Sequence, residues 1–462
     1  MGTLPASLVG DAYTSTRGLD LIESLVDLGN RMPGTAGERE AAALLAERFA
    51  NHGIREVETT AFPIPGWWRG ESSLTVGDSR FDAPNELVAL PGTPAGEVRG
   101  ELVDVGDGLP EDFEGRELEG KLVMASSLTP EDYGRWVHRG EKYAWAAEAG
   151  AVGFVFRNHV EGCLPPTGDV GARTGPGPIP AVGVSKELGS RLVRFCERKS
   201  VETRLSVECR NEPTRSRTVE GVVGPDTDEE VLVTAHVDAH DVGEGANDNG
   251  AGCALVSEVG RLLAGMEDEL ETRVRLVTFG AEETGLYGAY YWTHTRDLDR
   301  VKCVLNLDGA GYSRNLAIYT HGFDAIGEAF DEVSEECDAP IRVRSTIRPH
   351  SDHWPFVQRG VPGAQGRALA GESGRGWGHT HADTLDKIDG RDLRDLTVLL
   401  AAGTVKLAEE GREIARKGSE EIREATEEGG FDVGMKAVGS WPWAEEVKEW
   451  PWSGEGSAVP GE

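Results

Sequence analysis

The chain has 462 residues, a formal net charge of −33 and a pI near 4.7. This length predicts two or three domains, and an acidic balance without any basic patch argues against nucleic acid and anionic membranes as partners. The six cysteines form no CxxC pair. No apolar run reaches the roughly 18 residues of a membrane span, and the N-terminus lacks the pattern of a secretory signal. We therefore expect a cytoplasmic location.

The acidic residues are spread along the chain rather than gathered in one tail. A dispersed acidic surface is one way for a protein to stay soluble in concentrated salt, where charge repulsion is screened. We therefore expect a halophilic source, with an ordinary acidic protein as the alternative.

Residues 20–27 and 37–52 carry helical patterns, and strand patterns follow at 55–63 and 71–76. From about residue 91 to residue 211 the pattern changes to short apolar strands around one helix and a Gly/Pro-rich loop. The expected elements there are strands at 120–125, 152–157 and 179–185, a helix at 141–151 and a loop at 162–180. We expect this stretch to form a small, separately packed α/β module.

After residue 211, apolar strands alternate regularly with amphipathic helices up to about residue 411. The expected strands lie at 231–237, 273–283, 301–310 and 315–321, and the expected helices at 249–265, 284–297, 323–337, 351–360 and 392–411. This alternation predicts an α/β fold with a mostly parallel, mixed sheet and helices on both faces. In such sheets reactive groups gather at the carboxyl ends of the strands.

Residues 412–462 form an acidic tail with two copies of Trp-Pro-Trp, which place four rings at Trp441, Trp443, Trp450 and Trp452. One interpretation is a strap whose rings pack on the same chain. The alternatives are a contact with a second subunit and a wall of the substrate cleft.

Three segments, together with Asp308 in LNLDGAG (305–311), carry residues that suit metal chemistry. The first of the three is HVDAHDVGEGANDNGAG (236–252). His236 and Asp238 lie on one side of an extended segment, so His236 is expected on a metal with Asp238 behind it, orienting the ring. Asp248 follows glycines that let a carboxylate approach a cation, and it is expected to bridge two metals; an ordinary turn is the alternative. His240 and Asp241 are left as pocket residues.

The second segment carries the adjacent carboxylates Glu282 and Glu283 at an expected strand end. Neighbouring side chains there point apart, so Glu283 is expected to bind metal and Glu282 to act as general base and then acid; a solvated acidic turn is the alternative. Asp308 ends a buried strand, where a carboxylate requires a metal or an arginine. In the third segment, GHTHADT, either His379 or His381 could bind, and spacing does not choose between them.

The order and intervals of these segments resemble the zinc exopeptidases of the aminopeptidase and glutamate-carboxypeptidase family. The segments HVDAHDVGEGANDNGAG and WWRGESS (67–73) are most similar to the carboxypeptidase Q branch, and SDHWPFVQRGVPG (351–363) to a family segment beside the pocket. Residues 91–211 resemble the protease-associated domain inserted into many members. The resemblance covers residues 18–411 and implies a three-layer, phosphorylase/hydrolase-like sandwich.

The resemblance also implies a ligand set for two Zn²⁺ ions, with Co²⁺ or Mn²⁺ in place of one as an alternative. It places His236 and Asp308 on one ion, Glu283 and His379 on the other, Asp248 between them, and Glu282 as the base, with Asp238 assisting. It selects His379 because the ligand stands four residues before the aspartate of HTxxDT. It further implies a cis peptide bond between Asp248 and Asn249.

The domains expected on this basis are residues 1–90 and 212–411 as two parts of one catalytic domain, 91–211 as the insertion, and 412–462 as the tail. The expected activity is hydrolysis of short peptides by an aminopeptidase or dipeptidase, and a homodimer is plausible. The alternatives are a metallo-carboxypeptidase, an amidohydrolase acting on N-acyl amino acids, and a receptor-like homologue without activity. Arg348, Arg367 and Arg375 are candidates to bind a substrate carboxylate.

Overall fold

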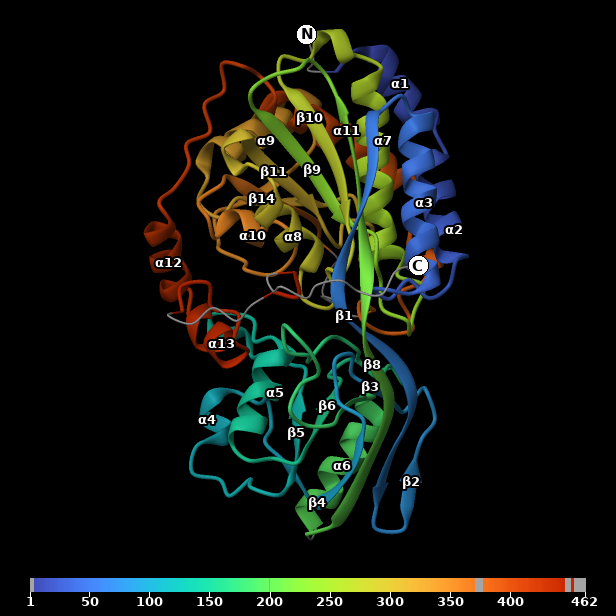
Figure 1. The fold of residues 1–462 in the computed structure, drawn as a ribbon, viewed down its shortest axis with the longest axis vertical. Coiled ribbons are helices and arrows are strands. Elements are labelled where there is room, and N and C mark those ends of the chain that lie inside the picture. Colours follow the sequence, from blue (N-terminus) through green and yellow to red (C-terminus); the bar gives the residue numbers. More distant parts are fainter. Residues whose placement is uncertain (1–3, 199, 370–376, 445–449, 453–462) are drawn as a thin grey trace. The chain divides into compact units, whose positions relative to one another are not determined.

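The computed structural model describes residues 4–198, 200–369, 377–444 and 450–452, and it divides into two compact units. The first unit comprises residues 1–62, 215–378 and 383–426, and the second comprises 63–214, 379–382 and 427–462. Two long strands, β1 (Arg55–Val76) and β8 (Glu202–Val223), run from one unit into the other (Figure 1).

The sheet of the first unit has the order β13-β12-β14-β11-β9-β10-β8. Strand β9 pairs in parallel with β10 and β11, β11 with β14, and β12 with β13, whereas β10–β8 and β12–β14 are antiparallel. The strands are β9 (Glu230–His236), β10 (Arg273–Phe279), β11 (Val301–Leu307), β12 (Leu316–Tyr319), β13 (Arg342–Arg344) and β14 (Gly363–Ala368).

Helices cover both faces of this sheet, as strands buried on both sides require. Strands β10 and β11 flank β9 on opposite sides, so right-handed crossovers place α7 (Ala251–Ala264) and α8 (Tyr287–Thr295) on opposite faces. On the α8 face, Leu232 of β9 packs with Trp292 of α8 and Phe356 of α10 (Trp354–Val357). The α/β fold with a mostly parallel sheet is confirmed.

The α7 face carries the remaining helices of the first unit. Helices α2 and α3 pack on α7, α1 packs on α11, and α11 contacts α7 and α9. Their bounds are α1 (Ala6–Thr14), α2 (Arg17–Val26), α3 (Ala36–Asn51), α9 (Asp324–Cys337) and α11 (Gly390–Leu407). None of the helices in the described ranges combines the length and hydropathy that a membrane crossing requires.

The second unit contains its own sheet, in the order β8-β4-β5-β6-β7-β3, with β4, β5, β6 and β7 parallel. Its core joins these strands to α5 through residues such as Val123, Tyr143 and Phe154. The elements are β2 (Ser79–Phe81), β3 (Leu87–Ala89), β4 (Gly96–Asp104), α4 (Pro110–Phe113), β5 (Leu122–Ser126), α5 (Arg139–Glu148), β6 (Gly153–Arg157), β7 (Ala181–Val184) and α6 (Lys186–Arg198).

The end of the chain forms α12 (Ser419–Glu428) and α13 (Phe431–Ala437). Helix α13 packs on α5 of the second unit, beside the buried Arg135–Glu141 ion pair of 2.7 Å. Trp441 and Trp450 are buried within the same chain, and the guanidinium of Arg173 lies 4.2 Å from the centre of the Trp450 ring. This arrangement is that of an intramolecular strap.

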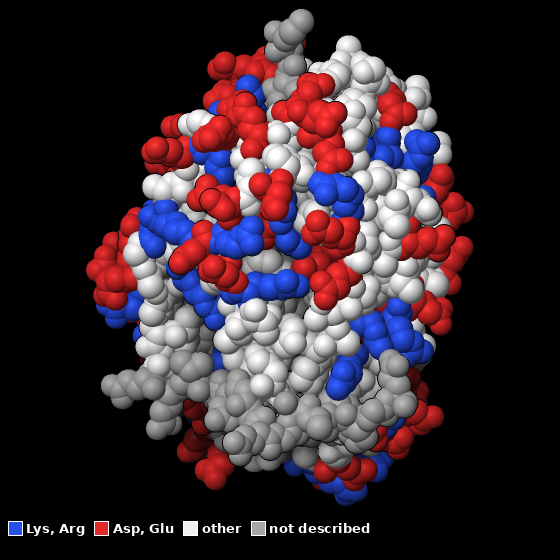
Figure 2. All heavy atoms as spheres, turned by 45° about the horizontal axis from the view of Figure 1, so that its top comes forward, with Lys and Arg blue, Asp and Glu red and all other residues white. Residues whose placement is uncertain are grey.

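Acidic side chains are distributed over the face drawn in Figure 2, and basic side chains lie among them. Ion pairs at the surface of the chain include Arg80–Asp82 at 2.8 Å and Lys417–Glu421 at 2.7 Å. Exposed pairs of this kind contribute only about 0–1 kcal/mol each.

Candidate metal centre

The candidate site lies at the carboxyl ends of three neighbouring strands in the first unit. His236 is the last residue of β9, Asp308 directly follows β11, and Glu282 and Glu283 lie in the turn after β10. Because these strands are parallel and adjacent, their carboxyl ends meet at one edge of the sheet. The fold therefore brings together residues that are up to 72 positions apart.

The turn that carries Glu282 and Glu283 differs from the sequence prediction, which extended the strand to residue 283. Strand β10 ends at Phe279, and Ala281 takes a left-handed conformation with φ of 57°. Gly280, just before this bend, packs closely on β8: an added Cβ would lie 2.2 Å from the Ser216 Oγ. The two carboxylates are thus separated by a turn and not by the alternation of a strand.

Asp238 holds this turn in place. Its carboxylate accepts the backbone N–H of Glu282 at 3.1 Å and that of Glu283 at 3.0 Å. The sequence predicted that this carboxylate would orient His236, but the nearest acceptor to the His236 Nδ1 is the backbone carbonyl of Asp238, at 3.0 Å, with the carboxylate at 3.6 Å. Since a carbonyl only accepts, Nδ1 donates to it. Burial lowers the pKa of His236, but the surrounding carboxylates raise it, and the net pKa lies well above the ordinary value. A metal bound at Nε2 would therefore displace a proton from that nitrogen.

The Nε2 of His236 faces two carboxylates. It lies 3.3 Å from Asp248 Oδ1 and 3.9 Å from Asp308 Oδ1. The ring is buried, and within the described ranges its Nε2 makes no hydrogen bond. A buried imidazole nitrogen between two carboxylates offers the ligand types that zinc takes.

Asp248 is positioned by a short π-helical turn, η2 (Ala246–Gly250), in which the Asp248–Asn249 peptide bond is cis. The carboxylate of Asp383 accepts the backbone N–H groups of Asn247 and Asp248 at 2.9 and 3.0 Å. Burial, with the nearby Asp248 carboxylate, raises the pKa of Asp383 to about 6. In the sequence, Asp383 was used only to select His379 by its spacing. The sequence did not predict that Asp383 anchors the turn that carries Asp248.

Negative charge accumulates at this site. Burial raises the pKa of Glu282 well above its ordinary value, and the carboxylates of Glu283 and Asp308 raise it further against the opposing effect of His236. Burial likewise raises the pKa of Asp352, whose two carboxylate oxygens have no hydrogen-bond partner in the described part of the chain. A divalent cation would supply the missing positive charge.

Asp308 is the exception among these carboxylates. Burial by itself would raise its pKa, but the contact with His236 lowers it, and the net pKa lies below the ordinary value. Gln365 Nε2 also donates to Asp308 Oδ2 at 3.2 Å. Asp308 is therefore held as a carboxylate, which is the form that ligates metals.

Two groups of potential ligands lie wholly in the first unit, each with its ligand atoms within 4.8 Å of one another. One combines His236 with Asp248 and Glu283, and the other combines His236 with Glu282 and Asp308. Imidazole nitrogens and carboxylate oxygens in this combination fit zinc.

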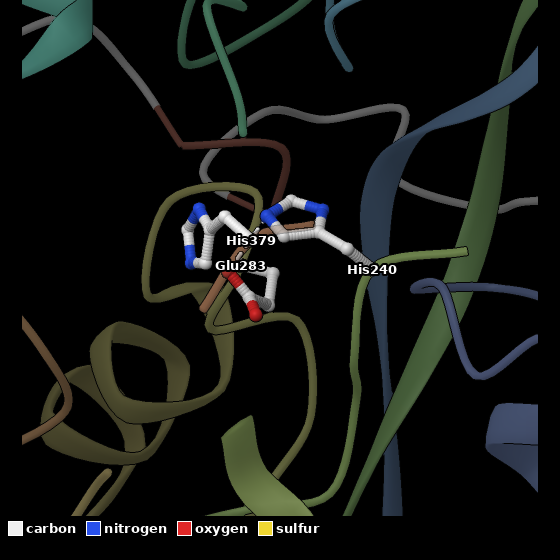
Figure 3. A group of neighbouring side chains, drawn as sticks. All are labelled: His240, Glu283 and His379. Atoms are coloured by element: carbon white, nitrogen blue, oxygen red, sulfur yellow. Dashed lines mark ion pairs between the residues drawn. The ribbon is translucent and has the colours of Figure 1, made fainter. Parts of the chain in front are cut away.

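His240, left as a pocket residue in the sequence, lies inside this constellation. Its Nε2 is 2.9 Å from Glu283 Oε2, and both side chains are buried. Figure 3 draws His240 and Glu283 together with His379. The sequence shows a histidine four positions after His236, but the direction of the His240 side chain depends on the loop that follows β9.

His379 belongs to the short segment 379–382, which groups with the second unit. There its Nδ1 lies 3.3 Å from the backbone carbonyl of Thr167 and 3.4 Å from Arg139 Nη1. Both contacts involve Nδ1, so a metal bound by this ring would be held through Nε2. His381 is exposed.

Among the arginine candidates, Arg367 lies beside the site, and its positive charge contributes to lowering the pKa of Asp308. Its Nη2 lies 2.9 Å from the position that a Cβ on Gly309, next to Asp308, would occupy. The guanidinium of Arg348 instead lies 4.6 Å from the centre of the Tyr319 ring. Arg375 lies outside the described residues.

Comparison with known proteins assigns both parts of the chain. The model of peptidase family M28 matches residues 218–403, and the PA domain model matches residues 98–192. The chain is 29% identical to aminopeptidase YwaD of Bacillus subtilis over 394 residues, which are 81% of this chain and 80% of that protein. It is 25% identical to carboxypeptidase Q of Bos taurus over 392 residues, 82% of each chain.

Among solved structures, the fold is similar to that of BSAP, a zinc aminopeptidase from Bacillus subtilis. The TM-score is 0.68 at 24% identity, covering 88% of this chain and 98% of that chain. The family predicted from the sequence is confirmed: the chain carries a domain of peptidase family M28 at residues 218–403 and a PA domain at residues 98–192.

Proposed function

We propose that this peptidase is a di-zinc exopeptidase that hydrolyses short peptides, in the manner of an aminopeptidase or dipeptidase. The observation that carries the proposal is the buried Nε2 of His236, which faces the carboxylates of Asp248 and Asp308 without a hydrogen bond in the described chain. The names of the two relatives, an aminopeptidase and a carboxypeptidase, support exopeptidase activity.

The proposed ligands are His236 and Asp308 for one zinc, Glu283 and His379 for the other, and Asp248 for both. Zinc bound here would lower the pKa of water and polarise the scissile carbonyl. Asp238 supports this set from behind, because its carboxylate and carbonyl contact the turn that carries Glu283 and the ring of His236.

Glu282 is the proposed general base. Its backbone N–H is held by Asp238, next to the Glu283 ligand, so its carboxylate is positioned independently of the metal. It would accept a proton from the attacking water and then donate that proton to the departing nitrogen. The alternative, Glu282 as a further metal ligand with Asp308 and His236, is distinguished by the metal content of a Glu282 variant.

Arg367 is the proposed recognition group for a substrate carboxylate. It lies beside Asp308, at the edge of the sheet where the metal ligands gather, and within the described ranges its guanidinium makes no ion pair. A dipeptide presents a carboxylate near its scissile bond, whereas an aminoacyl-anilide does not. This arginine therefore favours dipeptides over longer substrates that lack a nearby carboxylate.

A substrate screen tests this proposal. Dipeptides, dipeptide amides, aminoacyl-anilides and N-acyl amino acids would be offered to the zinc-loaded protein, with and without chelator. We expect chelator-sensitive cleavage of dipeptides, and Arg367→Leu to lower kcat/KM for dipeptides by about 10- to 100-fold, the value of a charge-assisted hydrogen bond, with little effect on anilides.

The matched control is the exposed Arg314→Leu, which should leave every substrate unchanged. Preferential cleavage of N-acyl amino acids would instead establish the amidohydrolase alternative. Equal loss on anilides and dipeptides in Arg367→Leu would exclude carboxylate recognition by this residue.

A further inference from the structure

His240 is a buried histidine that the proposed ligand set does not use. It lies in the loop after β9, four residues beyond His236, and only 5% of its surface is exposed. Its nearest charged neighbour in the first unit is Glu283, one of the proposed ligands, with 2.9 Å between Nε2 and Oε2. Figure 3 shows the ring directed toward that carboxylate.

The distance in this contact is that expected of two ligands on one cation. His240 Nε2 and Glu283 Oε2 lie 2.9 Å apart, and His236 Nε2 and Asp248 Oδ1 lie 3.3 Å apart. Ligand atoms about 2.0–2.1 Å from one zinc lie about 2.9–3.4 Å apart for bond angles between 90° and tetrahedral, and both pairs fall in this range.

We propose that His240 Nε2 is an additional ligand of the cation that Glu283 holds. This inference rests on the proposed function, in which the site binds two cations. It makes the two positions unequal: one would be held by Glu283, His379, His240 and the shared Asp248, and the other by only His236, Asp308 and Asp248. A four-donor site is closed, whereas a three-donor site keeps a position for water or substrate.

The two cations of the centre would therefore have different roles. The cation beside His240 is expected to bind more tightly and to be replaced more slowly. The cation beside His236 is expected to be the weaker one and the one at which the scissile carbonyl and the attacking water are activated.

The experiment compares the full-length protein with His240→Val and His240→Gln, the second of which keeps a polar side chain of similar size. Each protein would be stripped of metal, reloaded with zinc and dialysed against chelators of increasing strength, with zinc per chain measured at each step. X-ray absorption of the zinc-loaded proteins would count imidazole ligands, and far-UV circular dichroism would verify folding. The neighbouring Asp241→Asn is the control for a change in local charge.

We expect three imidazoles across two zinc ions in the wild-type protein and in Asp241→Asn, and two in both His240 variants. The affinity for one zinc should fall by more than the about 10- to 100-fold that loss of an outer-shell partner causes. An unchanged imidazole count would overturn the inference, whether affinity falls or not, because His240 would then only support Glu283. A wild-type protein without zinc would overturn the proposed function itself.

Discussion

Both units of this chain contain parallel strands, but they differ in how the polar groups at the strand ends are satisfied. In the first unit, β9 ends on His236 and β11 is followed by Asp308, with the Nε2 of His236 left outside any hydrogen bond among described residues. In the second unit, the buried amine of Lys142 donates to the carbonyls of Asp107, Ser126 and Leu128 at 2.6–2.8 Å. A sheet edge whose polar groups hydrogen-bond to one another has a structural role. A sheet edge with buried polar atoms that lack hydrogen bonds, and with excess negative charge, indicates a bound cation.

The largest expected effect is at the sheet edge of the first unit, where His236 and Asp308 lie. Asp308→Ala should remove a proposed metal ligand together with the carboxylate that faces His236. We expect loss of zinc from that position and loss of measurable peptidase activity, with the fold retained. Zinc per chain by elemental analysis, beside activity, measures this; full zinc occupancy in the variant would show that Asp308 is not a ligand.

The corresponding substitution in the second unit, at Lys142, should affect stability and not catalysis. Lys142→Met removes the donor of three carbonyls, of which that of Ser126 is buried and those of Asp107 and Leu128 are partly buried. The free energy of unfolding should fall by about 3 kcal/mol in total, measured by denaturant titration, while zinc content stays unchanged. Loss of zinc in this variant at temperatures where it is folded would contradict the contrast between the two edges.

A third expectation concerns acid stability of the first unit. Burial lowers the pKa of His353 to about 4 and also lowers that of His321, which stacks on it with ring centres 4.5 Å apart. Between pH 6.5 and pH 4 the unfolded chain therefore binds a proton at His353 that the folded chain does not, so stability is lost as pH falls through this window.

The His353 contribution amounts to about 3 kcal/mol near pH 4. His353→Gln should reduce the slope of unfolding free energy against pH between 6.5 and 4, and the difference between the two proteins isolates this residue from the acidic site. Identical slopes would show that the imidazole is already protonated in the folded state.

The smallest of the four effects is expected for a substitution at Glu282, which tests catalysis separately from metal binding at the sheet edge of the first unit. Glu282→Gln keeps size and hydrogen bonding but cannot accept a proton. Turnover should fall by at least about 10²-fold with zinc content unchanged. Glu335→Gln, an exposed residue of α9, is the control. A variant with wild-type turnover, or one that loses zinc, would contradict the assignment of Glu282 as base.

Much of the fold followed from the sequence because apolar residues predominate in the central strands. β9 and β11 were predicted close to their observed bounds since their residues are all buried. Strand β14 was missed, because GAQGRA lacks the β-branched and aromatic residues typical of strands. Its glycines pass close to neighbours: a Cβ on Gly366 would lie 2.9 Å from a Leu307 side-chain carbon.

The geometry within the site was less accessible. Residue types and spacing identified His236, Asp248 and Asp308, whose proximity depends only on adjacent parallel strands and the turn at Asp248. The left-handed Ala281, the anchoring by Asp238 and the approach of His240 to Glu283 depend on loop conformation. Loops carry no periodic pattern that sequence reasoning could use.

The central claim is that unsatisfied ligands at the edge formed by β9, β10 and β11 hold two divalent ions. The most direct measurement is elemental analysis of the purified, zinc-supplemented wild-type protein after removal of loosely bound metal. The account predicts two zinc ions per chain. Absence of stoichiometric metal, in a protein that is folded, would contradict it.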